Sequence, residues 1–151
     1  MAQPNRETVR DQLATLLTAQ LVTADSVVQA VYNYRIGDFA GLSPVVTVSS
    51  SGGNREQISA IPQPGVMDAV FYLTIHVFVL YAATGWTEAQ AEDRLDRIER
   101  GIADVLDANR VVTNVWQEID YQGDTTRDDV VIGGDDYIRE TIPIGVGALY
   151  G

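Results

Sequence analysis

The feature that most constrains this chain is a long apolar segment, residues 69–81 (AVFYLTIHVFVLY), whose side chains alternate between two different faces. A period of two residues is typical of a strand. The apolar face comprises Phe71, Leu73, Ile75, Val77, Val79 and Tyr81, and the semi-polar face comprises Val70, Tyr72, Thr74, His76, Phe78 and Leu80. The first face belongs in a core, whereas the second needs a less apolar cover, which a neighbouring subunit would supply.

The next segment predicts an amphipathic helix over residues 87–109. Thr87 and Gln90 stand three residues apart, as in a capping box, so the helix is expected to begin there. The stripe expected to be buried comprises Ala91, Leu95, Ile98, Ile102, Val105 and Leu106. On the outer face, the spacing of four residues predicts two ion pairs, Asp93 with Arg97 and Asp96 with Arg100.

The remaining segments complete an α-β-β-β-α-β-β order. A first helix is predicted over 6–20 with Asn5 as its cap, and further strands are predicted over 27–35, 45–50, 111–121 and 137–146. A loop is expected at 36–44, a turn at 51–54, an extended or mobile connection at 52–68, and a contact arm at 123–136. This order predicts one α+β domain spanning 1–151, with two helices packed on a mostly antiparallel or mixed sheet.

The charge balance bears on the partners of the chain. The 151 residues carry 21 acids against 10 bases, every base is an arginine, and the net charge is −11. Such a chain repels the phosphate backbone at long range, so a DNA-gripping module is not expected. The acidity fits either a salt-rich cytoplasm or simple solubility, and a GC-rich genome would also explain the absence of lysine. No apolar run is long enough for a membrane helix.

The residue types that carry chemistry form no known constellation. His76 is the one histidine, it lies inside a predicted strand, and no acid or nucleophile is placed beside it by the sequence. The acids at 128–129 and 135–136 do not follow the EF-hand spacing. There is no cysteine, and a phosphate-binding loop would need a lysine. The sequence therefore predicts no catalytic residue, no cofactor and no metal site, and a protein that is not an enzyme.

The order of elements resembles that of the tail terminator (tail completion) proteins of long-tailed bacteriophages and related archaeal viruses. The resemblance covers most of the chain. It comprises a first helix (LATLLTAQLV), a central strand (FYLTIHVFVLYA), a second helix (TEAQAEDRLDRIERGIADVL), a strand (VVTNVWQEIDYQG) and a last segment (GGDDYIRETIPIGVGA). The acidity and the missing lysines depart from the family and point to a halophilic archaeal host.

The resemblance implies a structural virion protein of the tail or neck, assembled in the host cytoplasm. Copies of the chain would form a ring, a hexamer in this family, that caps the tail tube and ends tail polymerisation. The ring would join the tail to the head–tail connector and leave a central channel through which DNA passes without specific binding. The implied partners are other copies of the chain, the tail tube protein and the connector or stopper protein, with no membrane, metal or cofactor.

The interface is expected in the 123–136 arm, the 36–44 loop and the exposed face of strand 69–81. The candidate interface residues are Phe39, Tyr72, His76, Phe78, Tyr121, Arg127, Asp128, Val130 and Ile132. Two alternatives stay open. One is another neck or tail component, either a head-closure stopper or a tail-tube subunit, and the other is a small α+β ligand-binding domain. The last would need a pocket with converging polar groups.

Overall fold

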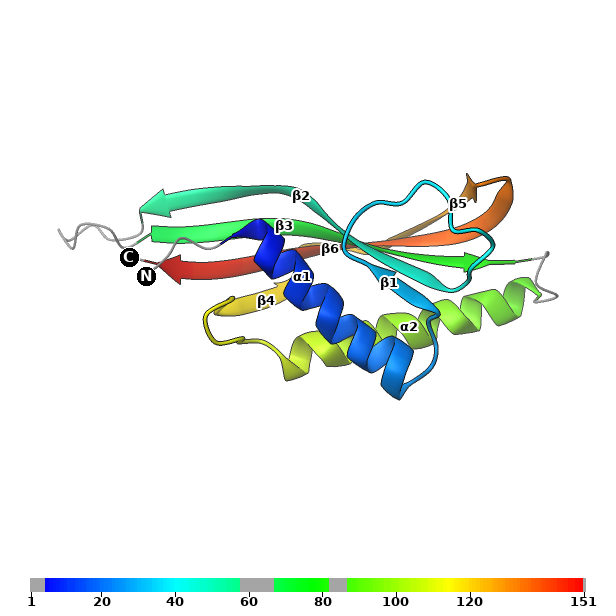
Figure 1. Cartoon of the computed structure of the whole chain (residues 1–151), viewed down its shortest axis with the longest axis horizontal. Helices are drawn as coiled ribbons and strands as arrows, with labels where there is room; N and C mark the ends of the chain where they lie inside the picture. The colour runs from blue at the N-terminus through cyan, green and yellow to red at the C-terminus, as the bar shows by residue number, and fades with distance from the viewer. Residues whose placement is uncertain (1–4, 58–66, 82–86, 151) are drawn as a thin grey trace.

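The structure is a computed structural model that describes residues 5–57, 67–81 and 87–150. The chain forms an α+β fold, which confirms the predicted class (Figure 1). Its elements, in order, are α1 (Arg6–Leu17), the π-helical segment η1 (Thr18–Ala24), β1 (Ala30–Tyr32), β2 (Val45–Gln57), β3 (Met67–Leu80), α2 (Glu88–Ala108), β4 (Glu118–Tyr121), β5 (Thr126–Ile132) and β6 (Asp135–Tyr150).

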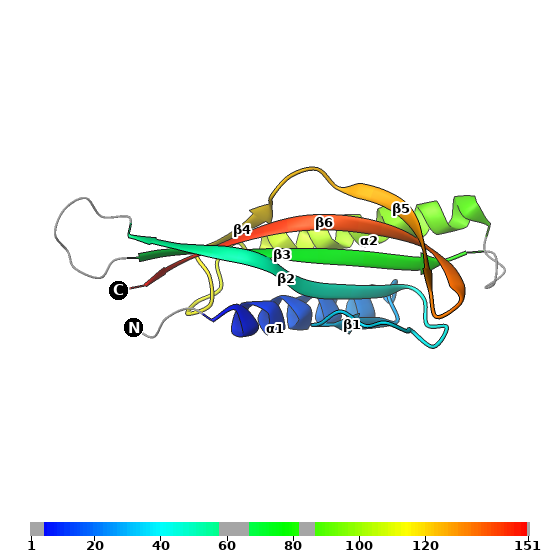
Figure 2. The same cartoon turned by 90° about the horizontal axis from the view of Figure 1, so that it is seen from above.

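The described strands form one mixed sheet in the order β1-β2-β3-β6-β4. The short β1 pairs with β2 in parallel, and the other pairings are antiparallel. The outer edge of β6 is shared, because β5 pairs with its residues 135–141 and β4 with its residues 144–147. The sheet is elongated, and at one end β2, β3 and β6 extend past both helices (Figure 2).

Both helices pack on the same face of the sheet, below it in Figure 1. They bury the face of β3 that begins with Phe71, as the alternation predicted, together with the predicted stripe of α2. Leu13 and Leu17 of α1 lie in the same cluster. Burying each such side chain contributes about 1.5–3 kcal/mol, so this layer is the main source of stability.

The helix starts follow the predicted capping. Asn5 Oδ1 accepts a hydrogen bond of 2.8 Å from the Glu7 amide at the start of α1. Thr87 and Gln90 form the full capping box at the start of α2, with bonds of 2.8 and 3.2 Å. The prediction of two ion pairs along α2 is wrong, because among the described residues neither Asp93 and Arg97 nor Asp96 and Arg100 form a salt bridge. Asp96 instead accepts a bond from Arg127 of β5.

The strand predicted over 45–50 was too short, because the glycines after it do not form a turn. Gly52, at φ 134°, lies at a bulge, and β2 continues to Gln57 alongside β3. The bulge shifts the register between Ser50 and Gly52 and keeps the strand paired. The rest of the predicted 52–68 connection, residues 58–66, lies outside the described residues.

The strand predicted over 111–121 was too long. Residues 112–116 form a tight turn, in which Val112 and Trp116 pair as an isolated bridge and Asn114 adopts φ 68°. Trp116 is buried, and its indole N–H donates a 2.9 Å hydrogen bond to the carbonyl of Asn109. This contact fixes the turn against the end of α2, so only residues 118–121 are left to pair as β4.

Two other predictions also need correction. Of the strand predicted over 27–35, only Ala30–Tyr32 pairs with a neighbour. The 123–136 arm is not an irregular loop, since Thr126–Ile132 forms β5 and pairs with β6 along its whole length. Gly133 and Gly134 form the two-residue turn between these strands, both at positive φ (58° and 85°), as a tight hairpin requires.

Candidate assembly surfaces

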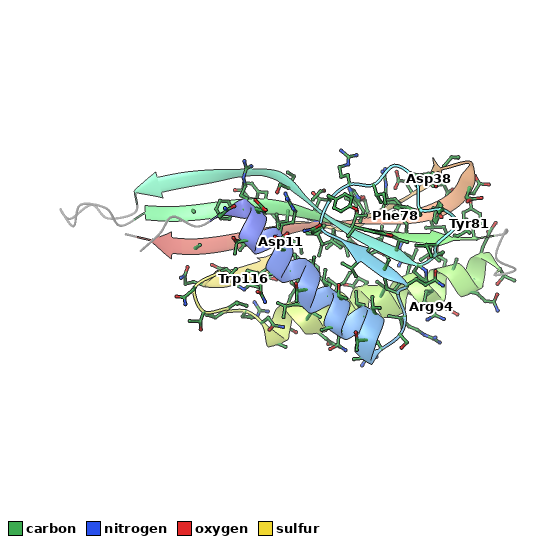
Figure 3. All side chains as sticks on the ribbon, in the orientation of Figure 1. Asp11, Asp38, Phe78, Tyr81, Arg94 and Trp116 are labelled. Atoms are coloured by element: carbon green, nitrogen blue, oxygen red, sulfur yellow. The ribbon has the colours of Figure 1, made fainter. Side chains whose placement is uncertain are left out.

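The face of the sheet opposite the helices is divided into a covered end and an open half. At the covered end, a second apolar cluster forms from Phe39, Val45, Phe78, Leu80 and Tyr137. The 36–44 loop covers this cluster, and the Tyr137 hydroxyl donates a 3.1 Å hydrogen bond to the carbonyl of Leu42 in the loop. Asp38 of the loop fills the space beside Gly133, so loop and β5–β6 hairpin meet there. Figure 3 labels Asp38 and Phe78 at this end.

The open half, here called the open face, comprises the half-buried side chains Ser49, Tyr72, Thr74, His76, Thr141 and Pro143. The strand register brings them together, since Thr74 lies between Ser49 and Pro143, and His76 lies beside Thr141. Tyr72 stands opposite Gly145, which adds no side chain to this face. In Figure 2 this part of the sheet faces the viewer, with the helices behind it. These side chains give the open face a mixed polarity.

His76 lies at the middle of the open face, beside Thr141. Its Nδ1 lies 3.1 Å from the Thr141 hydroxyl, and its ring centroid lies 5.9 Å from that of Phe78. Burial lowers the pKa of His76, and the positive charges of Arg139 and Arg35 lower it further. The ring is therefore neutral near pH 7. A base–nucleophile pair would also need a group that orients the histidine, and no carboxylate in the described part of the chain is bonded to its ring.

The structure separates the candidate interface residues into three groups. Tyr72 and His76 lie on the open face, where a partner could reach them. Phe39 and Phe78 are 2% and 6% exposed, and their ring centroids lie 4.7 Å apart inside the second cluster. They therefore hold the loop on the sheet instead of presenting a surface. Val130 and Ile132 are partly buried against the same cluster.

The other three candidates make contacts within the subunit. The Tyr121 hydroxyl donates a 3.0 Å hydrogen bond to Glu99 of α2, and burial together with this carboxylate raises the pKa of the phenol. Asp128 accepts two bonds from the Arg139 guanidinium, at 3.0 and 2.6 Å, which lower the pKa of its carboxyl. Arg127 forms the centre of a larger cluster.

Arg127 joins β5 to both α2 and β6. It binds Glu92, Asp96 at 2.6 Å and Glu140 at 2.9 Å. Glu140 is 2% exposed and points toward the helices among isoleucines. Burial raises the pKa of Glu140 more than Arg127 lowers it. The sequence does contain a signal for this cluster, because Glu140 is an acid within the apolar alternation of the last strand.

The grooves outside the open face, in the described part of the chain, include two beside the helices. One, of about 400 Å³, runs between α2 and β5, and its lining comprises Tyr81, Glu88, Ala89, Glu92, Arg127, Asp128, Asp129 and Ile138. The other, of about 540 Å³, lies between α1 and β1, where Asn33 already donates a hydrogen bond to Asp11. Among the described residues there is no group of three or more side chains suited to hold a metal ion.

The sheet also leaves part of an edge unpaired. β1 covers only Val45–Thr47 of β2, so within the described strands the outer edge of β2 has no neighbour from Val48 to Gln57. A row of free backbone donors and acceptors is a ready template for another strand. The bulge at Gly52 lies in this stretch and interrupts its regular spacing.

The net charge is unevenly divided along the chain. Residues 1–80 carry four arginines and six acids, whereas residues 81–151 carry six arginines and fifteen acids. The second part supplies α2, β4, β5 and β6, so most of the negative charge lies on that side of the sheet. Beside the open face, the described residues place the Asp128–Arg139 pair and the neutral His76, with Arg35 close enough to act on that histidine.

None of the helices in the described part of the chain is both long enough and apolar enough to cross a bilayer. Compared with known proteins, the sequence matches no family model and no curated protein.

Proposed function

We propose that this chain is a structural subunit that assembles with copies of itself into a ring, as a tail terminator of a long-tailed virus does. The ring caps the tail tube, ends tail polymerisation and joins the tail to the head–tail connector, with DNA passing through a central channel. The observation that carries the proposal is the open face, which the loops and helices in the described part of the chain leave without a cover.

The charge distribution supports contact through the open face. Two copies with a net charge of −11 repel each other, and the repulsion is smallest where neither copy presents unpaired carboxylates. The open face is such a region, with a neutral histidine and hydroxyl side chains. Its Tyr72 is of the residue type that anchors many interfaces.

The unpaired edge of β2 and the acidity support the ring in two further ways. A ring requires two different surfaces on each subunit that fit each other, and we propose the open face and the β2 edge as these two surfaces. An acidic channel wall would let DNA pass without binding, since like charges repel. The same features suit another neck or tail component, which is the alternative to the terminator.

The proposal is tested by size-exclusion chromatography with light scattering on the full chain, at low and at molar salt. We expect a single assembly with a mass several times 16.5 kDa, more stable in salt because screening reduces the repulsion between subunits. The variant Thr74→Arg, which places a long charged side chain in the middle of the open face, is expected to yield monomers.

The matched control is Thr23→Arg, which changes an exposed threonine of η1 by the same substitution. It should assemble as the unchanged chain does, and both variants should keep their melting temperature within a few degrees. A chain that stays monomeric at every salt and protein concentration contradicts the ring. Binding of the assembly to tail tubes, compared with binding to connectors, separates a terminator from a stopper.

A further inference from the structure

β5 is an exposed strand whose two halves are held by different forces. The half next to the hairpin turn packs Val130 and Ile132 against the second cluster. The other half, Thr126–Asp129, is exposed at all four residues. In the described part of the sheet β5 pairs only with β6. Apart from these backbone bonds, the exposed half is held by charged side chains.

Two sets of ion pairs hold that half, one on each face of the sheet. Toward the helices, Arg127 binds Glu92 and Asp96 of α2 and the buried Glu140 of β6. On the opposite face, Asp128 binds Arg139 of β6 through two hydrogen bonds. Salt and protons weaken such contacts far more than they weaken apolar packing.

We propose that Thr126–Asp129 is a releasable strap, held closed by Arg127, which opens when Arg127 loses its partners. Opening frees the outer edge of β6 at 138–141 and the groove between α2 and β5. The half of β5 that ends at Ile132 stays in place, because the tight Gly133–Gly134 turn and the second cluster hold it.

The three carboxylates that bind Arg127 differ in how strongly salt screens their attraction to it. The side chains of Glu92 and Asp96 are 50% and 67% exposed, so salt screens their attraction to Arg127, whereas that of Glu140 is 3% exposed and is screened little. The other charged groups near Arg127 and Glu140 are Glu99 of α2 and Asp128 and Asp129 of the strap.

Amide hydrogen exchange on the full chain at pH 7 and low salt tests the strap. In Arg127→Gln, the amides of 126–129 that bond to β6 are expected to exchange at least about ten-fold faster, while those of 130–132 and α1 stay within about two-fold. The control Arg97→Gln removes the same charge from an exposed position of α2 and should leave every segment unchanged. Raising the salt concentration of the unchanged chain to the molar range should speed the same four residues, because salt screens the exposed Glu92 and Asp96.

Unchanged exchange of 126–129 in Arg127→Gln overturns the strap. A uniform increase through the whole chain also overturns it, because Arg127 would then be a general stabilising contact. Should Arg127→Gln not fold, the double variant Arg127→Gln with Glu140→Leu decides, since it carries no buried unpaired acid. Fast exchange of 126–129 in the folded double variant supports the strap, and slow exchange refutes it.

Discussion

The two faces of the sheet reach stability in different ways. The helix-covered face buries a continuous apolar layer from α1, α2, β2, β3 and β6. The opposite face has a compact apolar cluster at one end and half-buried hydroxyl, tyrosine and histidine side chains over the rest. The helix-covered face is thus closed by apolar packing within the subunit, whereas half of the opposite face keeps polar, half-buried side chains.

The edges of the sheet differ in the same sense. On the β6 side, β4 and β5 occupy most of the outer edge, and β5 is attached there through ion pairs. On the other side, β1 covers three residues of a 13-residue strand. The acidic side of the molecule is thus closed by its own strands, whereas the less charged side is open.

The largest expected effect on the free energy of unfolding comes from truncating a buried side chain on the helix-covered face. Leu95→Ala removes a side chain that is 1% exposed in the helix-covered layer, and should lower the free energy of unfolding by about 2–5 kcal/mol. Thr74→Ala on the open face should change it by less than about 0.5 kcal/mol. Urea unfolding of both variants in the unassembled chain gives the comparison. Equal losses would mean that the open face is as fully packed as the other.

A smaller effect is expected at the acidic edge. Arg127→Gln leaves Glu140 buried without its cation, and should cost about 2 kcal/mol at pH 7, less than a fully buried pair because Arg127 is 34% exposed. The cost should shrink as the pH falls.

The pH dependence of the cost of Arg127→Gln follows from Glu140, whose pKa is raised in the folded chain by burial. A raised pKa favours the protonated folded state, so stability is lost as the pH rises through that pKa and is retained below the ordinary glutamate range. Without Arg127 this pKa rises further, and the gap between variant and unchanged chain closes in acid. A gap that is constant from pH 7 to 4 contradicts the role given to Glu140; Arg97→Gln serves as the control.

The smallest effect concerns the open face. The pKa of His76 is lowered by burial and by Arg139 and Arg35, so the neutral ring contributes stability above about pH 6.5, and this contribution is lost as the pH falls toward the lowered pKa. His76→Gln should remove that part of the pH dependence and change stability little at pH 8. Thermal melts of both chains between pH 8 and 5 measure it, and parallel pH profiles would refute the assignment.

The helix-covered face was largely predictable from the sequence. Its elements carry strong local signals: the capping box at Thr87, the Asn5 cap, and the period-two pattern of residues 69–81. Local propensity and tertiary packing agree there, so the pattern and the structure coincide.

The other regions depended on contacts that no local pattern contains. The glycines at 52–53 are typical of a turn, but pairing with β3 keeps them in the strand, next to a bulge. Residues 112–116 alternate as a strand does, but the buried Trp116 folds them back on α2. The Gly133–Gly134 pair is a known hairpin signal that was overlooked inside a polar stretch.

The candidate interface residues were predictable only in part. The open-face positions of Tyr72 and His76 follow from strand alternation, which the sequence displays. The burial of Phe39 against Phe78 does not, because it depends on how the 36–44 loop returns over the sheet. The ion pairs of Arg127 with Glu92 and Asp96 connect residues more than thirty positions apart, a distance at which sequence spacing carries no information.

The central claim, that this chain functions by joining copies of itself, is tested most directly by electron microscopy of the purified full chain at molar salt. The account predicts closed rings with a central channel, in which Tyr72 and Thr74 of each subunit lie against a neighbouring copy. Single subunits with a bound small molecule held by converging polar side chains, and with the open face exposed to solvent, would contradict it.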